Sequence, residues 1–239
     1  MPHRDWSVRG PLVALVICLA GSSLEAQTVR PTTSPTDRTI RYVKRGAPVR
    51  RVSAGVRGHT EVSLDRQVVA LLAPRDHIAW TSSEQPDLYW RFAGRSAQVA
   101  QAMLIVTRGI AADTLALPRP EPGLQRITLH GTALRLRRGV DHRWAIVIHY
   151  DDADLESSMD EAWLRVVPGK VPASAAHDAI AHAQSAAAVG LWYDAFATLT
   201  SEYAHDPEDE KLVAMWNTFL SGTVPGLTPP PMRPRSMRP

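Results

Sequence analysis

Residues 142–150 read His-Arg-Trp-Ala-Ile-Val-Ile-His-Tyr, and this stretch decides the fold class. Trp144, Ile146 and Ile148 alternate with smaller apolar residues, so an extended strand here carries apolar side chains on both faces. A strand that is apolar on both faces is covered on both. We therefore expect residues 142–150 to form a central strand of a sheet.

The sequence on either side repeats short apolar runs between turn residues. The runs recur about every ten residues, which is typical of an antiparallel β-sandwich and not of alternating strand–helix–strand units. This pattern predicts a mainly β fold, an immunoglobulin-like sandwich of about eight strands. The predicted strands cover residues 67–72, 87–92, 99–107, 112–116, 125–129, 133–137, 142–150 and 162–167.

After Pro168 the apolar period changes to that of an α-helix. The first predicted helix has Ser174 as its N-cap, runs to Val189 and has Gly190 as its C′ residue. A second helix follows, and a third covers about residues 209–220. The predicted buried face of the last two helices consists of Trp192, Ala195, Phe196, Leu199, Tyr203, Leu212, Trp216, Phe219 and Leu220.

The first two helices have the spacing of a tetratricopeptide repeat. Gly190, Ala195, Leu199 and Pro207 match the second half of such a repeat, and the first helix is correctly placed for the other half. One repeat cannot form a solenoid. The hairpin is either a peptide-binding groove or a cap on the sandwich.

Three stretches resemble the bacterial domain-of-unknown-function 928 family, over about residues 45–222. They are residues 45–58, residues 70–90 (ALLAPRDHIAWTSSEQPDLYW), and residues 190–216, which open GLWYDAFATL. Val49 and Leu191 depart from the family's usual glycine and isoleucine. The positions that match the family's motifs are Gly46, Pro48, Arg50, Arg51, Gly55, Arg57, Pro86, Trp90, Trp192, Tyr193, Asp194, Pro207 and Trp216. The resemblance implies an exported sandwich-plus-helix protein and no particular reaction.

The N-terminus has the layout of a secretory signal peptide. His3, Arg4 and Arg9 precede an apolar run over residues 11–20, and a polar stretch leads to Ala26. The run is too short for a permanent membrane helix, which needs about 20 residues. We therefore expect cleavage near Ala26, no transmembrane span in the mature chain, and a periplasmic or secreted bacterial location.

Cysteine usage and composition bound the rest of the chain. Cys18 is the only cysteine and lies in the predicted leader, so the mature chain has no disulfide and no cysteine ligand. The predicted organisation is a signal peptide (1–26), a disordered basic linker (27–44), a glycine-arginine strap (45–58) followed by the sandwich (to 167), a helical module (168–222) and a disordered proline- and arginine-rich tail (223–239).

Charge is distributed unevenly along the chain. Residues 27–58 carry eight basic residues against one acidic residue, which is +7, whereas residues 59–222 carry 14 basic and 21 acidic residues, which is −7. A basic arm can bind anionic lipid or polysaccharide, or fold back onto the acidic body. Export disfavours nucleic acid, and so does the scarcity of aromatics among its arginines, where Tyr42 stands alone.

The sequence contains no recognisable catalytic, cofactor or metal motif. The acidic run over residues 151–161 begins like a calcium loop, but Ser157 replaces the turn glycine and Trp163 the bidentate glutamate. We therefore expect a solvated hairpin loop there. His177 and His182 are five apart and cannot form the zinc pair of a helix. A catalytic site remains open only through residues that converge in space, for which His77, His130, His142 and His149 are the candidates.

The candidate interaction surface combines the strap with the start of the second helix. The helical period directs Trp192 to the core and leaves Tyr193 and Asp194 exposed, and we expect the strap's arginines to dock near Asp194. The surface consists of Arg50, Arg51, Arg57, Tyr193 and Asp194. The favoured function is an exported, non-enzymatic envelope protein that acts as a protein–protein interaction or structural module. The alternatives are a binder of anionic envelope surface or glycan through the basic arm, and a cryptic hydrolase.

Overall fold

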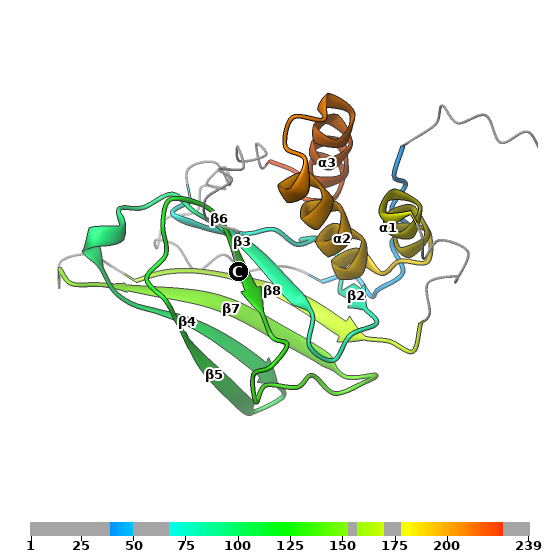
Figure 1. The fold of residues 1–239 in the computed structure, drawn as a ribbon. Coiled ribbons are helices and arrows are strands. Elements are labelled where there is room, and N and C mark those ends of the chain that lie inside the picture. The colour runs from blue at the N-terminus through cyan, green and yellow to red at the C-terminus, as the bar shows by residue number, and fades with distance from the viewer. Residues whose placement is uncertain (1–38, 50–66, 153–156, 170–177, 227–239) are drawn as a thin grey trace, which may run out of the picture. The chain divides into compact units, whose positions relative to one another are not determined.

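The computed structural model describes residues 39–49, 67–152, 157–169 and 178–226. The described chain is mainly β, with two sheets followed by three helices (Figure 1). The smaller sheet has the order β1 (Val69–Leu71), β3 (Asp87–Phe92), β6 (Gly123–Thr128). The larger has the order β2 (Ala79–Thr81), β8 (Ser158–Val166), β7 (Asp141–Tyr150), β4 (Val99–Arg108), β5 (Ala111–Leu117).

Residues 142–150 lie in β7, the middle strand of the larger sheet. β7 pairs with β8 on one side and β4 on the other, which confirms the expected central strand. Trp144, Ile146 and Ile148 are fully buried, and Ala145 and Val147 on the opposite face are 8% exposed. The larger side chains of β7 therefore form the core, and the smaller ones lie on the outer face of this sheet.

One of the eight predicted strands is wrong, and one observed strand was not predicted. Residues 133–137 are a loop, because the side-chain nitrogen of Gln85 donates to the carbonyls of Leu129, Thr132 and Leu134 at 2.9, 3.0 and 3.1 Å and replaces strand pairing there. The three-residue strand β2 was not predicted, and it pairs in parallel with β8, so the larger sheet is not purely antiparallel. The other seven predicted strands correspond to β1 and β3–β8, with shifted ends.

Aspartate side chains cap the N-termini of α1 (Ala179–Ala188) and α3 (Glu210–Thr223), whereas α2 (Trp192–His205) begins after Leu191 with no side-chain cap. α1 starts at Asp178, whose Oδ1 accepts from the backbone nitrogens of Ile180 and Ala181. Ser174, the predicted N-cap, lies outside the described residues. Gly190 follows the helix with φ of +87°, which confirms the predicted C′ residue. α2 and α3 bury the predicted apolar face.

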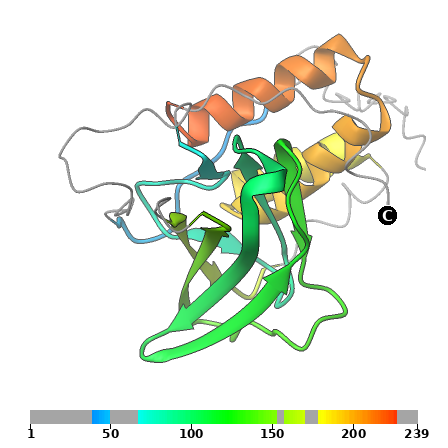
Figure 2. The same ribbon diagram turned by 90° about the vertical axis from the view of Figure 1, so that its left-hand side faces the viewer.

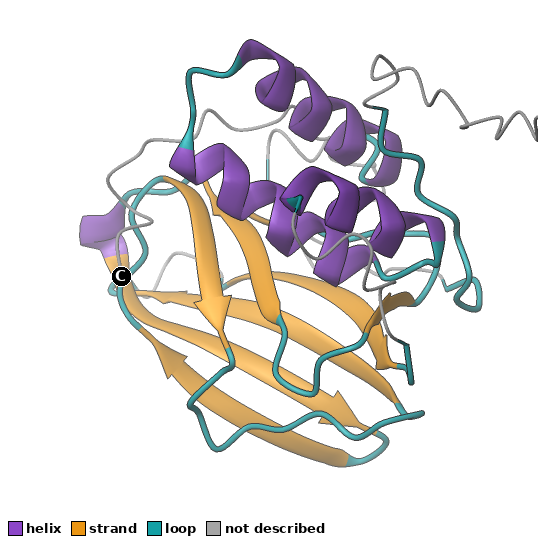
Figure 3. Ribbon diagram, turned by 45° about the vertical axis from the view of Figure 1, so that its right-hand side comes forward, coloured by secondary structure: helices purple, strands orange, loops and turns teal. Residues whose placement is uncertain are grey.

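α2 packs against both sheets, through β2 of the larger sheet and β3 of the smaller sheet (Figures 1 and 3). β3 is buried on both faces, because Tyr89 and Trp90 point in opposite directions and each is 2% exposed. The Tyr89 ring meets the edge of Phe196 on α2, with centroids 5.2 Å apart. The helices thus cover one face of the smaller sheet.

Residues 39–49, here called the docked segment, lie along the helices and the loop between β1 and β2. The backbone nitrogen of Val43 donates to the carbonyl of Ala187 at the end of α1. Pro48 forms an isolated bridge with His77. Residues 39–44 belong to the stretch for which the sequence predicted a disordered linker, but packing and backbone hydrogen bonds hold them against the body. Of the predicted strap, residues 45–49 are described and 50–58 lie outside the described residues.

Candidate functional site

The site is built where the docked segment crosses the loop after β1. Two backbone bonds align the two stretches of chain: Ile78 donates to the carbonyl of Ala47 at 2.8 Å, and Val49 donates to that of Asp76 at 3.0 Å. Gly46 is required at the crossing, because a Cβ there would lie 1.7 Å from the carbonyl oxygen of Ile78. Glycine at position 46 therefore permits close approach of the two backbones.

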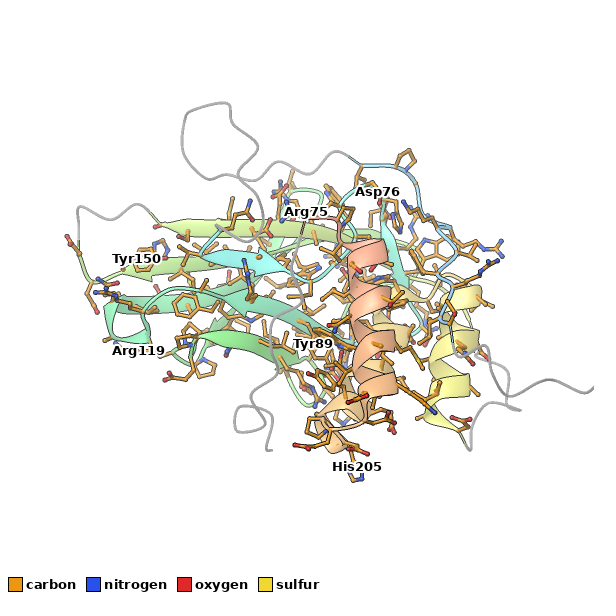
Figure 4. All side chains as sticks on the ribbon, turned by 90° about the horizontal axis from the view of Figure 1, so that it is seen from above. Arg75, Asp76, Tyr89, Arg119, Tyr150 and His205 are labelled. Atoms are coloured by element: carbon orange, nitrogen blue, oxygen red, sulfur yellow. The ribbon has the colours of Figure 1, made fainter. Side chains whose placement is uncertain are left out.

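Four side chains form a continuous row of polar contacts at this crossing. Lys44 Nζ donates to Asp76 Oδ2 at 2.5 Å, and Asp76 Oδ1 lies 2.6 Å from His77 Nδ1. His77 Nε2 lies 2.6 Å from the hydroxyl of Tyr42, whose ring also stacks on the imidazole. Figure 4 labels Asp76 beside Arg75 in this loop. We call Tyr42, Lys44, Asp76 and His77 the latch.

The electrostatics of the latch favour a fixed arrangement of protons. Burial raises the pKa of the Tyr42 phenol, so its hydroxyl stays protonated and can donate to His77. Partial burial alone would raise the pKa of Asp76, but the hydrogen bonds from Lys44 and His77 outweigh it and hold that pKa below its ordinary value. With its proton on Nδ1, the ring donates to Asp76 and accepts from Tyr42.

The order of groups in the latch resembles that of an acid–base relay, but the ring nitrogens of His77 face other latch residues and not solvent. His77 is 3% exposed, and its two ring nitrogens face Asp76 and Tyr42. A general base must reach the proton that it removes from a substrate. The arrangement therefore fastens the docked segment to the body and does not present a base to solvent.

The structure places Tyr193 in the core and not on the surface. The side chain is 1% exposed, and its hydroxyl accepts from Trp144 Nε1 at 2.8 Å and lies 3.4 Å from the carbonyl of Trp163. The prediction of an exposed Tyr193 is wrong, because α2 is buried on two sides at its first turn. Trp192 packs against Phe196 and Phe219 while Tyr193 reaches the larger sheet.

Asp194 is half-buried and already has a partner in the described chain. Its carboxylate accepts from the backbone nitrogen of Ser82 at 3.0 and 3.2 Å and from the Ser82 hydroxyl. The contact joins the loop after β2 to the first turn of α2. A negative charge in that turn also interacts favourably with the helix dipole. Arg50, Arg51 and Arg57, which the sequence assigned to the same surface, lie outside the described residues.

The acidic run divides into two parts: Asp151 and Asp152 are exposed, as predicted for a solvated loop, whereas Asp160 and Glu161 are buried in β8, where that prediction is wrong. Asp160 is fully buried, and its Oδ2 accepts from the backbone nitrogen of Leu71 at 2.8 Å and from Arg75 Nη2 at 2.9 Å. Its Oδ1 accepts from the nitrogen of Glu161. Because β8 begins at Ser158, Asp160 belongs to the strand and points into the core between the sheets.

His142 is held by its neighbours in one protonation state. Its Nε2 accepts from the backbone nitrogen of Arg137 at 3.2 Å, and its Nδ1 lies 3.0 Å from the carbonyl of Val140. The ring is 2% exposed, and burial is the main reason that the pKa of His142 lies below its ordinary value of 6.5. A second proton on Nε2 would oppose the donor of Arg137.

We expect His142 to lower the folding stability of the chain at mildly acidic pH. Because the unfolded chain binds the proton more tightly, the contribution of His142 to the free energy of unfolding is fully present above pH 6.5. The free energy of unfolding then decreases as the pH drops from 6.5 to the folded-state pKa, by at most about 1.4 kcal/mol per pH unit. Urea unfolding of wild type and His142→Gln at several pH values measures this. Equal pH slopes in the two proteins would contradict it.

The described histidines do not assemble into a metal or catalytic cluster. Within the described ranges, no three His, Cys, Asp or Glu side chains gather closely enough to hold a metal ion. His149 contacts Ser157, His142 contacts backbone, and His130 is exposed. None of the described helices is both long and apolar enough to cross a membrane.

Comparison with known proteins identifies the family. A family model described as Domain of Unknown Function (DUF928) matches residues 52–227, about three quarters of the chain. The chain belongs to the DUF928 family. No curated protein matches it. Among solved structures, a superoxide reductase (neelaredoxin) from Ignicoccus hospitalis is similar at 15% identity and a TM-score of 0.27, covering 42% of this chain and 82% of that chain. At this TM-score the likeness establishes no shared fold.

The described motif residues within the matched range 52–227 are mainly structural, and so are Gly46 and Pro48, which precede that range. Gly46 and Pro48 form the crossing beside the latch, and Trp90 lies in the core. Trp216 on α3 donates to the Thr200 hydroxyl of α2 at 3.0 Å. Sequence reasoning missed the latch, since Tyr42 and His77 are 35 residues apart and the Asp-His pair matches no known motif. The only sequence signal for it was Gly46 itself.

Proposed function

We propose that this DUF928 protein is exported and acts in the bacterial envelope, in the periplasm or secreted, as a non-enzymatic interaction or structural module. Its partner is another exported protein that offers apolar side chains to the larger sheet. The leader pattern of residues 1–26 and the absence of cysteine from the remaining chain support export.

The outer face of the larger sheet carries this proposal. On a solvent-facing side, a strand normally alternates apolar-in with polar-out. Here the outward positions include Met103, Ile105, Met159 and Trp163, all partly exposed. The strand registers place Met103 and Met159 on either side of Val147, and Ile105 beside Ala145. The apolar stripe is therefore continuous across three strands.

A hollow of about 160 Å³ lies within this face. Its walls combine apolar groups with one ion pair, in which Arg143 lies 3.4 Å from Glu161. A partner side chain that enters the hollow would bury apolar surface against Ile105 and Met159 and find a donor and an acceptor beside it. Such a mixture suits a protein partner better than a lipid surface. The lining residues are Ile105, Thr107, Arg143, Ala145, Met159 and Glu161.

Export and binding are tested separately. For export, the chain is produced in its bacterial host, the cells are fractionated, and the mature N-terminus is determined by mass spectrometry. We expect recovery outside the cytoplasm with a terminus near Gln27. An intact N-terminus in the cytoplasmic fraction would reject the export proposal.

For binding, a photo-crosslinking residue replaces Met159 on the outer face or Ser201 on α2, which is exposed on the helical side. We expect one discrete protein adduct from position 159, none from 201, and loss of the adduct when Ile105→Lys is added. Adducts of equal yield from both positions would reject the face as a binding site. Salt-labile recovery of lipid or polysaccharide alone would favour the basic arm of residues 27–58 as the binding element instead.

We infer that the two sheets form an immunoglobulin-like sandwich and that α1 and α2 form a tetratricopeptide-like hairpin that caps it. The buried Ala183, Ala186 and Ala187 of α1 and the turn at Gly190 support a close helical pair. The parallel pair of β2 and β8 is the main departure from a standard sandwich.

A further inference from the structure

We infer that two copies of this chain associate through β5, pairing antiparallel about Thr114 so that their larger sheets become continuous. The inference is independent of the proposed partner on the outer face, because it uses the edge of the sheet. β5 is the last strand of the larger sheet, on the side away from the helices (Figures 1 and 2). No described residue pairs with its outer edge.

The direction of the backbone groups follows from the hairpin that precedes β5. Arg108 and Ala111 pair across a two-residue turn, in which Gly109 has φ of +58°. The residues that flank such a turn form a hydrogen-bonded pair, and the pairs then alternate along an antiparallel ladder. The register to Leu117 has no bulge. The backbone groups of Ala112, Thr114 and Ala116 therefore point away from β4, toward the open edge.

β5 lacks the features that usually block an edge strand. Native edges carry lysine, proline or a bulge, or are very short. The strand reads Ala-Ala-Asp-Thr-Leu-Ala-Leu, with one charge, and five of its seven residues are exposed. The turn beside it presents Ile110, which is fully exposed to solvent. Pairing of this edge with a second copy would also bring Ile110 into contact with that copy.

The other sheet edges are less suited to association. β1 and β2 have three residues each. On β6, Gln125 Nε2 donates to the carbonyls of Leu124 and Glu121 at 3.1 and 2.6 Å, so its own side chain occupies part of that edge. β5 is thus the longest open edge in the described chain.

The sequence of β5 suits pairing with itself in one register. With Thr114 opposite Thr114 of the second copy, Ala112 lies opposite Ala116, and all three outward-pointing positions form hydrogen-bonded pairs, with about six bonds between the chains. Asp113 then lies opposite Leu115. In the register centred on Asp113 the two carboxylates would oppose each other, which is unfavourable. The Thr114 register also brings Ile110 opposite Pro118 of the second copy.

A charge-swap experiment on the purified full chain tests the register directly. Thr114→Lys and Thr114→Glu each place two like charges opposite each other on the exposed face. Sedimentation velocity over a range of concentrations should show a wild-type dimer, and each variant should dissociate at concentrations at least tenfold higher than wild type. A 1:1 mixture of the two variants should recover the dimer.

Ala111→Lys is the matched control, because in the proposed register residue 111 lies opposite Leu117 of the second copy and not opposite a like charge. This variant should remain dimeric. A wild-type chain that is monomeric at its highest soluble concentration would overturn the inference. So would a Thr114→Lys variant that dimerises as well as wild type, or a mixture that stays monomeric. Circular dichroism of each variant confirms that the chain is folded, so that dissociation reports the interface.

Discussion

Replacing Asp160 by alanine is expected to lower the free energy of unfolding by about 3 kcal/mol, because it removes the acceptor from a buried charged hydrogen-bond network and leaves the donors in place. Asp160 is fully buried, whereas the Arg75 side chain is 22% exposed. Arg75 can therefore recover some hydration in the variant. The backbone nitrogen of Leu71 cannot, because Leu71 is fully buried and loses its acceptor.

Urea unfolding measures this loss, with an unchanged slope as the sign that the same two states are compared. Asp141→Ala is the matched control. Asp141 accepts from Arg165 at 2.6 and 2.7 Å on the neighbouring strand, but both side chains are about one third exposed. An exposed pair of this kind contributes about 1 kcal/mol or less. Equal losses in the two variants would contradict the structural role of Asp160.

Replacing Gly46 by alanine is expected to release the docked segment. The added Cβ would overlap the backbone oxygen of Ile78, and a backbone atom cannot move aside as a flexible side chain can. Separation of the two backbones also breaks the Lys44–Asp76 and Tyr42–His77 contacts. If the overlap removes about 1.4 kcal/mol of docking free energy, the open population rises tenfold.

Limited trypsin digestion reports this opening, because cleavage of a transiently open segment follows its population. We expect cleavage after Arg41, Lys44 and Arg45 to accelerate at least tenfold, with each product identified by mass. Gly222→Ala is the matched control, since a Cβ there meets no atom within 4 Å and alanine suits the helix. An unchanged cleavage rate in Gly46→Ala would show that the segment docks by other means.

The sequence allowed prediction of the parts of the fold that rest on local periodicity. Residues 87–92 coincide with β3, and the two-faced apolar pattern of residues 142–150 correctly gave a central strand. Gly190 as the residue after α1 followed from its place behind an alanine-rich helix. In each case a few neighbouring residues carry the whole signal.

The parts that could not be predicted depend on contacts between distant residues. Nothing near residues 133–137 shows that Gln85 donates to the carbonyl of Leu134, and β2 is too short to display a period. Asp160 lies 85 residues from Arg75, so its acidic neighbours suggested a solvated loop. For the candidate surface, the period of α2 alone could not show that both sides of its first turn are covered, which is why Tyr193 was misplaced.

The docked segment also sets an order of events in time. It lies near the start of the chain, but the backbone that receives Val43 belongs to Ala187, and the Tyr42 ring meets Phe219 on α3. A ribosome makes the segment early and its receiving surface only in the last quarter of the chain. Because a contact of such long sequence separation closes late, a seated segment reports that the C-terminal helices are already in place.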